Sequence, residues 1–483
     1  MEKNKVEKLP FRLLVIFALG QFGWSLASFG AGNTLLYFYM PPSDPATGQL
    51  AIPLFISQHP VFFAVTVIGI ITAIGRIFDA VTNPLIATWS DRSMAKMGRR
   101  RFFMAFSAAP FALLSFLIFF PPVNASSYVN AAWLFAVLIL FYFFFVAYTT
   151  PYTALISELG HTPNERLTIS TAISITWALG FLLGQGTYAL KDLFAAGFFP
   201  GLLADPATAS IAKTYGVQIT FAVFAVIALI CMYLPVIFID ERKYAESHVS
   251  EQGVFSALAS AFKNKNFVRF VISDLMYWIS LNFIQAGIVY FVTILLKLPD
   301  STVTMGMGVM FLLSFVLYVP VNLTAQKFGK KRVLVFAFIV FSTVFLFVSL
   351  MGSSFMPVPP MTHLVIVMVL TAVPMAIFGI IPNAIVADIA ESDGITTGNY
   401  KAAIFYGTRT FIMNLGIAIA IFIFPSFLLI GRDPAKPDVI TSAGPVVAAL
   451  AAIVFCVLGL FVFLMYNENE VQSIIDTKHK SSQ

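Results

Sequence analysis

Charged residues are scarce in this chain, and their scarcity excludes most classes of protein at once. Only 11% of the 483 residues are Asp, Glu, Lys or Arg, while 59% are hydrophobic. A soluble globular protein carries about 25% charged residues. The composition therefore predicts a polytopic membrane protein.

Cysteine and histidine are also sparse. Cys231 and Cys456 are the only cysteines, and each stands alone in an apolar stretch, which argues against a disulfide framework or a thiolate metal site. The five histidines fall in predicted loops or near predicted helix ends. This placement excludes a histidine proton relay deep in a membrane.

The signatures of enzymes are missing too. The sequence shows no pairing of a nucleophile with a base, no metal-ligand cluster, and no phosphate-binding glycine loop in a segment long enough to fold outside the membrane. We therefore expect no enzymatic activity and no cofactor beyond a coupling ion.

Long hydrophobic runs fill the chain instead, and we expect it to be all α-helical within the membrane. Twelve runs are long enough to span a bilayer. They lie at about residues 11–40, 60–88, 102–120, 128–157, 167–190, 216–239, 266–296, 302–325, 333–351, 361–390, 401–430 and 443–466.

A polar stretch at 240–265 separates the first six runs from the last six. We therefore predict an N-terminal six-helix half at 1–239, a cytoplasmic linker at 240–265, a C-terminal six-helix half at 266–466, and a cytoplasmic tail at 467–483. The connection at 191–215 is predicted to be an outward-facing loop.

Lysine and arginine predict the orientation. Most of the 29 lie on one side of the predicted spans; the exceptions outside the spans are Lys191, Lys213, Lys297, Arg432 and Lys436. By the positive-inside rule both termini are cytoplasmic. The net charge of +6 is thus a topology signal, and no nucleic-acid partner is expected. We expect the protein to lie in a plasma membrane, and its short tails and loops favour the inner membrane of a bacterium.

The two predicted halves echo each other in sequence. The basic motif Gly98–Arg101 recurs as Gly329–Arg332, and Ala154–Glu158 recurs as Ala384–Asp388, at nearly the same offset. Parallel six-helix repeats describe the major facilitator fold, in which the halves rock to give alternating access. We predict this fold, with two pseudo-symmetric six-helix halves.

The second span carries charges that a membrane helix rarely keeps. Arg76 and Asp79 lie inside it, and a charge at that depth costs about 2.5 to 3.5 kcal/mol. Asp79 and Asn83 are four residues apart and share a helical face, with Thr82 close to it. This group could bind Na⁺, while a proton needs only the carboxylate. The alternative is that Asp79 merely neutralises Arg76.

These motifs resemble the signature of the glycoside-pentoside-hexuronide:cation symporters, the melibiose permease group of the major facilitator superfamily. The residues that carry the resemblance are Arg76, Asp79, Asn83, Pro84, Ser90 to Arg92, Gly98 to Arg101, Pro151 to Leu155, Glu158, Glu165, Arg166 and Ala387 to Ile389. The resemblance implies that helix two carries the cation-binding carboxylates, that helix four adds ligands, and that a sugar binds between the halves.

Several positions depart from the pattern of that group. Asn83 stands where its sodium-coupled members have a second Asp, and Thr149 stands where melibiose permease has an Asp ahead of the helix-four Pro. Ser25 replaces an acidic residue on helix one, and a basic residue of helix eleven would align near Asn414. The expected cation-coupling set is therefore Asp79, Thr82, Asn83 and Thr149, with H⁺ or Na⁺ as the ion.

Polar and aromatic residues on five predicted helices suit a sugar, which needs hydrogen bonds and an aromatic platform. The candidate substrate-binding residues are Gln21, Trp24, Ser25, Tyr152, Trp177, Asp274, Trp278, Asn282, Gln285, Arg409 and Asn414. Two alternatives stay open: the aromatic residues could be packing, and Asp274 could pair with Arg409 as a structural bridge.

Charged residues at the predicted cytoplasmic ends could form a gate of ion pairs that hold the outward-open state. The candidates are Asp91, Arg92, Arg99, Arg100, Glu158, Arg166, Asp388 and Glu391. Neutralising Arg92 or Arg100 is expected to lower the transport rate more than ligand affinity.

The sequence thus favours a secondary active transporter that couples H⁺ or Na⁺ to symport of a sugar or glycoside. One alternative is a carrier of lysolipids or other amphiphiles on the same fold, and another is a non-transporting sensor or scaffold. The expected partners are a small-molecule substrate and the lipid bilayer, and the protein is expected to be monomeric.

Overall fold

The computed structural model describes residues 7–45, 47–62, 65–122, 126–245, 261–398, 402–433 and 439–481. Twelve of its helices are long and apolar enough to cross a membrane. The prediction of an all-α protein with twelve spans is confirmed. The chain divides into two compact units, one formed by α1 to α9 and the other by α11 to α17. Part of the predicted linker, 246–260, lies outside the described residues.

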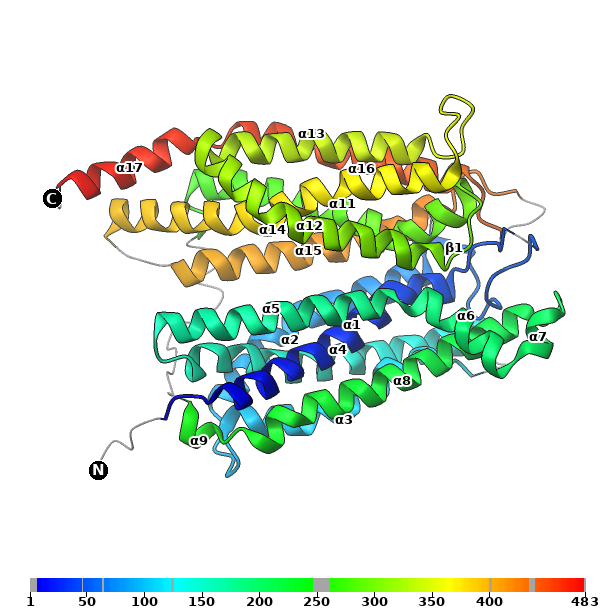
Figure 1. Ribbon diagram of the computed structural model, residues 1–483, viewed down its shortest axis with the longest axis horizontal. Helices are drawn as coiled ribbons and strands as arrows, with labels where there is room; N and C mark the ends of the chain where they lie inside the picture. The colour runs from blue at the N-terminus through cyan, green and yellow to red at the C-terminus, as the bar shows by residue number, and fades with distance from the viewer. Residues whose placement is uncertain are drawn as a thin grey trace. The chain divides into compact units, whose positions relative to one another are not determined.

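The first unit contains six long helices. They lie roughly alongside one another (Figure 1). They are α1 (Phe11–Tyr39), α2 (Val67–Asp91), α3 (Arg99–Leu117), α4 (Ser127–Leu159), α5 (Pro163–Gln185) and α8 (Ala209–Phe238). The short elements are β1 (Pro60–Phe62) and β2 (Val65–Thr66), which form a two-stranded sheet, and the helices α6 (Thr187–Phe198), α7 (Pro200–Ala204) and α9 (Glu241–Tyr244).

Most of the predicted loop at 191–215 is helical, which corrects that expectation. In α6 the buried residues Thr187, Tyr188, Lys191 and Ala195 recur at helical spacing, so one face of this helix is covered, and α6 packs against α8. Packing of this face against α8 stabilises a helix here even though the segment is too short to span a membrane.

Close approach of backbones holds α1 against α5 and α8. A Cβ added to Gly184 would lie 2.9 Å from the backbone nitrogen of Gly30, and one added to Gly23 would lie 2.8 Å from the carbonyl oxygen of Ala228. Small residues at these crossings let helices pack tightly where no hydrophobic effect drives their association. Helix α1 is therefore the central element of its unit.

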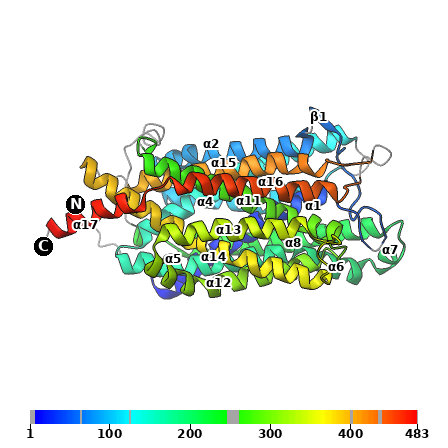
Figure 2. The same ribbon diagram turned by 90° about the horizontal axis from the view of Figure 1, so that it is seen from above.

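The second unit also has six long helices, and these lie roughly alongside one another in the views of Figures 1 and 2. They are α11 (Lys265–Tyr290), α12 (Thr302–Phe328), α13 (Lys330–Ser349), α14 (Pro360–Thr397), α15 (Ala402–Leu428) and α16 (Ala443–Leu464). A π-helical turn (Phe291–Leu295) extends α11, and α17 (Glu468–Ser481) occupies most of the segment that the sequence analysis treated as a tail.

Candidate functional site

The strongest candidate site lies inside α2, where a buried carboxylate lies beside a half-buried guanidinium. Asp79 is only 4% exposed, and its Oδ2 lies 3.7 Å from Nη1 of Arg76, one turn earlier. This ion pair is loose. Oδ1 of Asp79 and Nε of Arg76 have no hydrogen-bond partner among the described residues. Buried polar atoms are rarely left unpaired, and exceptions deserve a functional explanation.

The carboxylate is surrounded by the polar residues that the sequence predicted. Asn83 follows Asp79 by four residues on the same helix, so the two side chains share a helical face. The hydroxyl of Thr82 donates to the carbonyl oxygen of Phe78 at 2.8 Å, within its own helix. Asp79, Thr82 and Asn83 thus lie together on α2.

Helix α4 reaches this group through a residue that the sequence analysis missed. The hydroxyl of Thr150 donates to Oδ1 of Asn83 at 2.6 Å. The predicted residue, Thr149, instead donates to the carbonyl oxygen of Phe145 at 2.9 Å, within α4. Both hydroxyls precede Pro151, and only the structure reveals which one faces α2.

A small cavity lies beside Arg76, within the first unit. Its volume is about 30 Å³, and it is lined by Ser28 and Gly32 of α1, by Arg76, and by Tyr142 and several apolar residues. The guanidinium carbon of Arg76 lies 5.1 Å from the centroid of the Tyr142 ring. A cavity of this volume has room for about one or two water molecules, and its polar side chains are those of Ser28, Arg76 and Tyr142.

The predicted substrate residues of α1, α4 and α5 lie at helix contacts within the first unit. The hydroxyl of Tyr152 donates to the carbonyl oxygen of Phe17 at 2.6 Å, and the hydroxyl of Ser25 donates to the carbonyl oxygen of Trp177 at 2.8 Å. Both Tyr152 and Ser25 are fully buried. These bonds favour the packing alternative for Ser25 and Tyr152.

Trp24 and Gln21 differ from these packing residues. The ring of Trp24 makes an edge contact with Phe145, which lines the small cavity, and its Nε1 has no hydrogen-bond partner among the described residues. Gln21 is buried on the preceding turn. Trp24 thus contacts a residue that lines the cavity.

The second unit holds its own buried acid–base pair. Nε of Arg409 donates to Oδ2 of Asp274 at 2.9 Å, and Nη2 donates to Oδ1 at 3.3 Å. The third nitrogen, Nη1, donates to Oδ1 of Asn383 at 2.7 Å. The bidentate pair joins α11 to α15, and Asn383 adds α14. This geometry favours a structural bridge, one of the two interpretations that the sequence left open.

The remaining predicted residues of the second unit are half-buried on α11 and α15. They are Trp278, Asn282, Gln285 and Asn414. The Asn282 amide donates to the Trp278 carbonyl oxygen at 2.8 Å, while Nε1 of Trp278 has no hydrogen-bond partner among the described residues. The sequence therefore placed these side chains correctly on neighbouring turns, and their role in binding stays a prediction.

Four of the predicted gate residues of the first unit, Asp91, Arg99, Arg100 and Glu158, form a cluster at the start of α3. Nη2 of Arg99 donates to Oε1 of Glu158 at 2.8 Å, and Nη2 of Arg100 donates to the same oxygen at 3.2 Å. Arg100 also forms an ion pair with Asp91 and donates to the Ser90 hydroxyl.

Glu241, which the sequence analysis missed, completes this cluster from α9. Its carboxylate accepts backbone N–H bonds from Arg100 at 3.0 Å and from Arg101 at 2.8 Å. Free N–H groups at a helix start favour a negative charge. Gly98 precedes them with φ of 115°, a conformation that favours glycine.

The second unit repeats the arrangement. Glu468 of α17 accepts the backbone N–H of Lys330 at 2.8 Å, and Nζ of Lys330 donates to Asp388 at 2.5 Å. Nζ of Lys331 donates to the carbonyl oxygen of Tyr466 at 2.6 Å, and burial raises the pKa of the Tyr466 hydroxyl. We call these two clusters the collars: Ser90, Asp91, Arg99, Arg100, Arg101, Glu158 and Glu241 in the first unit, and Lys330, Lys331, Asp388 and Glu468 in the second.

Each of these collar pairs joins residues of one unit. Arg92 and Glu391 are exposed, and the side chain of Arg166 lies outside those that the structure describes. The collars therefore brace each unit internally. The predicted gating role of the eight candidate residues stays a prediction.

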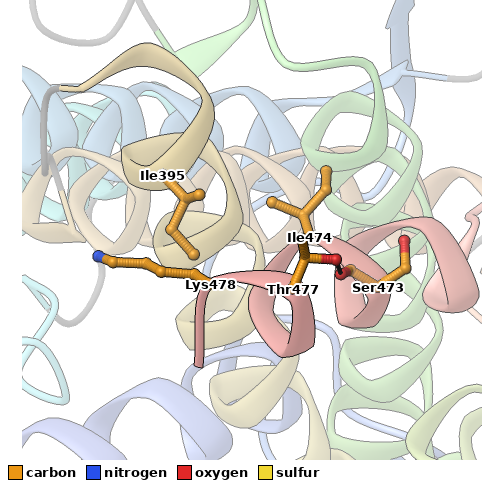
Figure 3. A pocket seen from close by; sticks show the side chains of 5 residues that line it. All are labelled: Ile395, Ser473, Ile474, Thr477 and Lys478. Atoms are coloured by element: carbon orange, nitrogen blue, oxygen red, sulfur yellow. Dashed lines mark hydrogen bonds between the residues drawn. The ribbon is translucent and has the colours of Figure 1, made fainter. Parts of the chain in front are cut away.

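A larger cavity, of about 430 Å³, lies at the end of α14 and on α17 (Figure 3). Ile395 lines it together with Ser473, Ile474, Thr477 and Lys478. The hydroxyls of Ser473 and Thr477 donate to carbonyl oxygens of their own helix, which leaves mostly apolar groups facing the cavity. It is lined by none of the buried charges, so it is a weaker candidate than the α2 site.

Two six-helix units with buried charge pairs in their membrane helices define a transporter of the major facilitator class. The chain belongs to the family described as MFS/sugar transport protein, which matches residues 16–470. This confirms the resemblance to the glycoside-pentoside-hexuronide:cation symporters. The family is one of transporters, so the expectation that the chain is not an enzyme is confirmed on that ground.

Two curated relatives and one solved structure illustrate the range of similarity. The isoprimeverose transporter of Lactiplantibacillus pentosus is 24% identical over 57% of this chain and 56% of its own length, so the chain spans about half of that relative. The sodium-dependent lysophosphatidylcholine symporter 1 of Xenopus tropicalis is 21% identical over 86% of this chain and 82% of its own length.

The crystal structure of the nucleoside transporter NupG superposes with a TM-score of 0.62. It covers 94% of this chain and 99% of its own, at 14% identity. At that identity the likeness shows the fold alone, which confirms the predicted major facilitator architecture.

Proposed function

We propose that the protein is a cation-coupled symporter of a sugar or glycoside, with Asp79 as the coupling carboxylate and a proton as the preferred ion. The observation that carries the proposal is the unpartnered Oδ1 of Asp79, buried in a membrane-spanning helix. A carboxylate at that depth in a membrane costs free energy, so we expect it to take part in ion transport.

The choice of a proton rests on the charge and ligands available. Asp79 offers one negative charge, and Arg76 already offsets part of it at 3.7 Å. A hard metal cation prefers several oxygen ligands, whereas a proton needs only one carboxylate oxygen. The group of three, Asp79, Thr82 and Asn83, is therefore better suited to H⁺ than to Na⁺.

Support for a sugar comes from the family and from the relative named as an isoprimeverose transporter. A second candidate substrate class is a lysolipid. The relative named for lysophosphatidylcholine aligns over a larger share of this chain. In addition, the hydroxyls of two predicted sugar ligands, Ser25 and Tyr152, already donate hydrogen bonds to backbone carbonyl oxygens of the first unit.

The proposed orientation follows from the bias of lysine and arginine, with both termini in the cytoplasm of a bacterial cell. In this orientation the collars face the cytoplasm. We propose 1–239 and 266–466 as the moving halves and 240–265 as their linker.

Uptake by proteoliposomes tests the function. Labelled mono- and disaccharides and labelled lysophosphatidylcholine are offered under an imposed pH gradient or Na⁺ gradient, with the parent chain, Asp79→Asn, and Asp205→Asn as a matched control on an exposed connection. We expect accumulation of a sugar under the pH gradient, lost in Asp79→Asn and kept in Asp205→Asn. Accumulation of the lysolipid alone would select the second substrate class, and equal accumulation by Asp79→Asn would refute the coupling role.

A further inference from the structure

The ring of Tyr142 on α4 lies over the Arg76 side chain of the α2 site. The guanidinium carbon is 5.1 Å from the ring centroid, within the distance of about 6 Å at which the negative face of an aromatic ring attracts a cation. Tyr142 is buried, so water screens this attraction little. The Arg76 guanidinium therefore has two partners, the ring of Tyr142 and the carboxylate of Asp79 at 3.7 Å.

A glycine in α2 makes room for this ring. A Cβ added to Gly75 would lie 2.7 Å and 2.9 Å from two carbon atoms of the Tyr142 ring, which is too close for any side chain there. The ring thus packs on the backbone of α2, one residue before Arg76. Arg76 and Tyr142 also line the same small cavity. The local sequence therefore fixes the ring beside the guanidinium.

The acid–base pair of the second unit shows how an arginine contacts its acid when no ring lies over it. Among the described residues, the cation–π contacts include one of Arg76 and none of Arg409. Two nitrogens of Arg409 donate to the carboxylate of Asp274. Nε of Arg76 and Oδ1 of Asp79, in contrast, have no hydrogen-bond partner in the part of the chain that the structure describes. The ring accompanies the pair that leaves a carboxylate oxygen open.

Building on the proposed function, we propose that Tyr142 is a positioning residue for the coupling carboxylate. Its ring face holds the Arg76 guanidinium partly away from Asp79, and so keeps Oδ1 of Asp79 open to a proton. Without the ring, the buried cation is drawn toward its remaining partner, the carboxylate. An opposite charge that comes closer favours the ionised form of a carboxyl group, so the carboxylate would bind a proton less tightly.

The effect passes through Arg76, because the other ionisable groups on the packed helices lie elsewhere. Arg76 is the charged neighbour of Asp79, and Tyr142 is the titratable group beside Arg76 on α4. Helix α3 also packs against α2, but its arginines lie at its start, where Arg100 pairs with Asp91. Asp91 is about 18 Å further along α2 than Asp79.

Infrared difference spectroscopy of the purified full-length protein tests the proposal without a known substrate. The carbonyl band of the protonated Asp79 carboxyl group is followed as the pH changes, and it is assigned by its loss in Asp79→Asn. Tyr142→Leu removes the ring face. In this variant we expect the proton affinity of Asp79 to fall about tenfold, which moves the titration by about one pH unit. Tyr142→Phe keeps the ring and should titrate as the parent does.

Two further variants separate the ring face from the loss of aromatic volume. Phe141→Leu removes a ring from the wall of the same cavity and should leave the titration unchanged. If Tyr142→Leu does not fold, Tyr142→Phe with a trifluorinated ring replaces it. Fluorine withdraws negative charge from the ring face and nearly keeps its shape, so this variant should bind a proton less tightly than Tyr142→Phe does.

The proposal is overturned if Asp79 titrates as in the parent in Tyr142→Leu, or in the fluorinated variant where Tyr142→Leu does not fold. The loose pair would then follow from the spacing of Arg76 and Asp79 on one helix. An equal change in Phe141→Leu would assign the effect to packing, and a change in Tyr142→Phe would assign it to the hydroxyl; either result overturns the proposal. So does a parent protein in which no Asp79 band titrates.

Failure of this proposal is distinguishable from failure of the proposed function. The infrared titration reports on the Asp79 carboxyl group and requires no transport. The coupling role of Asp79 is decided separately, by accumulation of substrate in Asp79→Asn under a pH gradient.

Discussion

Each unit of this transporter has an acid–base pair within its long helices, and the two pairs are built differently. In the first unit, Arg76 and Asp79 belong to one helix, lie 3.7 Å apart, and leave a carboxylate oxygen without a partner among the described residues. In the second unit, Asp274 and Arg409 belong to two helices and form a bidentate pair that Asn383 extends.

The difference indicates what each pair can do. A buried pair with all its hydrogen bonds satisfied stabilises a fixed geometry, and it loses that geometry if one partner changes its charge. A loose pair with a free oxygen can gain or release a proton with little rearrangement. The first pair is therefore suited to coupling, and the second to holding three helices together.

The largest effect on stability is expected at the second pair. Asp274→Ala leaves Arg409 buried without its counter-charge, which typically costs about 3 to 5 kcal/mol. Asp79→Asn should lower the melting temperature much less, because it breaks only a loose contact. Thermal unfolding of both variants in detergent checks this, and an equal loss of stability in the two would contradict the comparison.

A double substitution tests whether the pair of Asp274 and Arg409 is only a structural bridge. Replacing the bridge by apolar residues, as Asp274→Leu with Arg409→Met, removes both buried charges and should recover most of the stability lost in Asp274→Ala. The melting temperature of the double variant is the measurement. If the double variant is less stable than the single one, the pair is more than a bridge.

Substitutions in the collars should have an intermediate effect on stability. Glu241→Gln removes the charge that binds the first N–H groups of α3, at a cost of about 1 kcal/mol. Glu468→Gln should have a similar effect on α13, because Glu468 also accepts backbone N–H groups at the start of its helix. Melting temperatures of the two variants test this likeness, and a large effect in only one unit would show that the collars are not equivalent.

The smallest effect on stability is expected at Arg92, which is exposed. Arg92→Gln should change stability by less than about 0.5 kcal/mol. If Arg92 has the predicted gating role, the transport rate falls while the ligand concentration for half-maximal uptake stays the same. Kinetics of uptake measure both quantities, and weakened binding at an unchanged rate would refute the role.

The sequence predicted the fold well because its signals are long and redundant. Twelve apolar runs and two repeated basic motifs point to one architecture, which the structure has. The segment at 191–215 was missed because α6 is short and its buried face includes Lys191, a residue type that ordinarily indicates a loop outside the membrane.

The candidate site was predictable only where its residues share a helix. Asp79, Thr82 and Asn83 lie on one turn of α2, so spacing alone brings them together. The contribution of α4 was assigned to Thr149 instead of Thr150, because sequence cannot tell which of two adjacent hydroxyls faces a neighbouring helix. Glu241 and Glu468 were missed for a related reason, since each follows the last long helix of its unit and meets its partners only in the fold.

The central claim is that Asp79 exchanges a proton during transport while Asp274 does not. The most direct test measures pH-gradient-driven accumulation and equilibrium exchange of the same labelled substrate in proteoliposomes, for Asp79→Asn and for Asp274→Asn. We expect Asp79→Asn to lose accumulation but keep exchange, and any Asp274→Asn protein that folds to retain both in the parent's proportion. Two results would contradict this assignment of roles. One is that Asp79→Asn still accumulates substrate; the other is that Asp274→Asn, and not Asp79→Asn, loses accumulation while it keeps exchange.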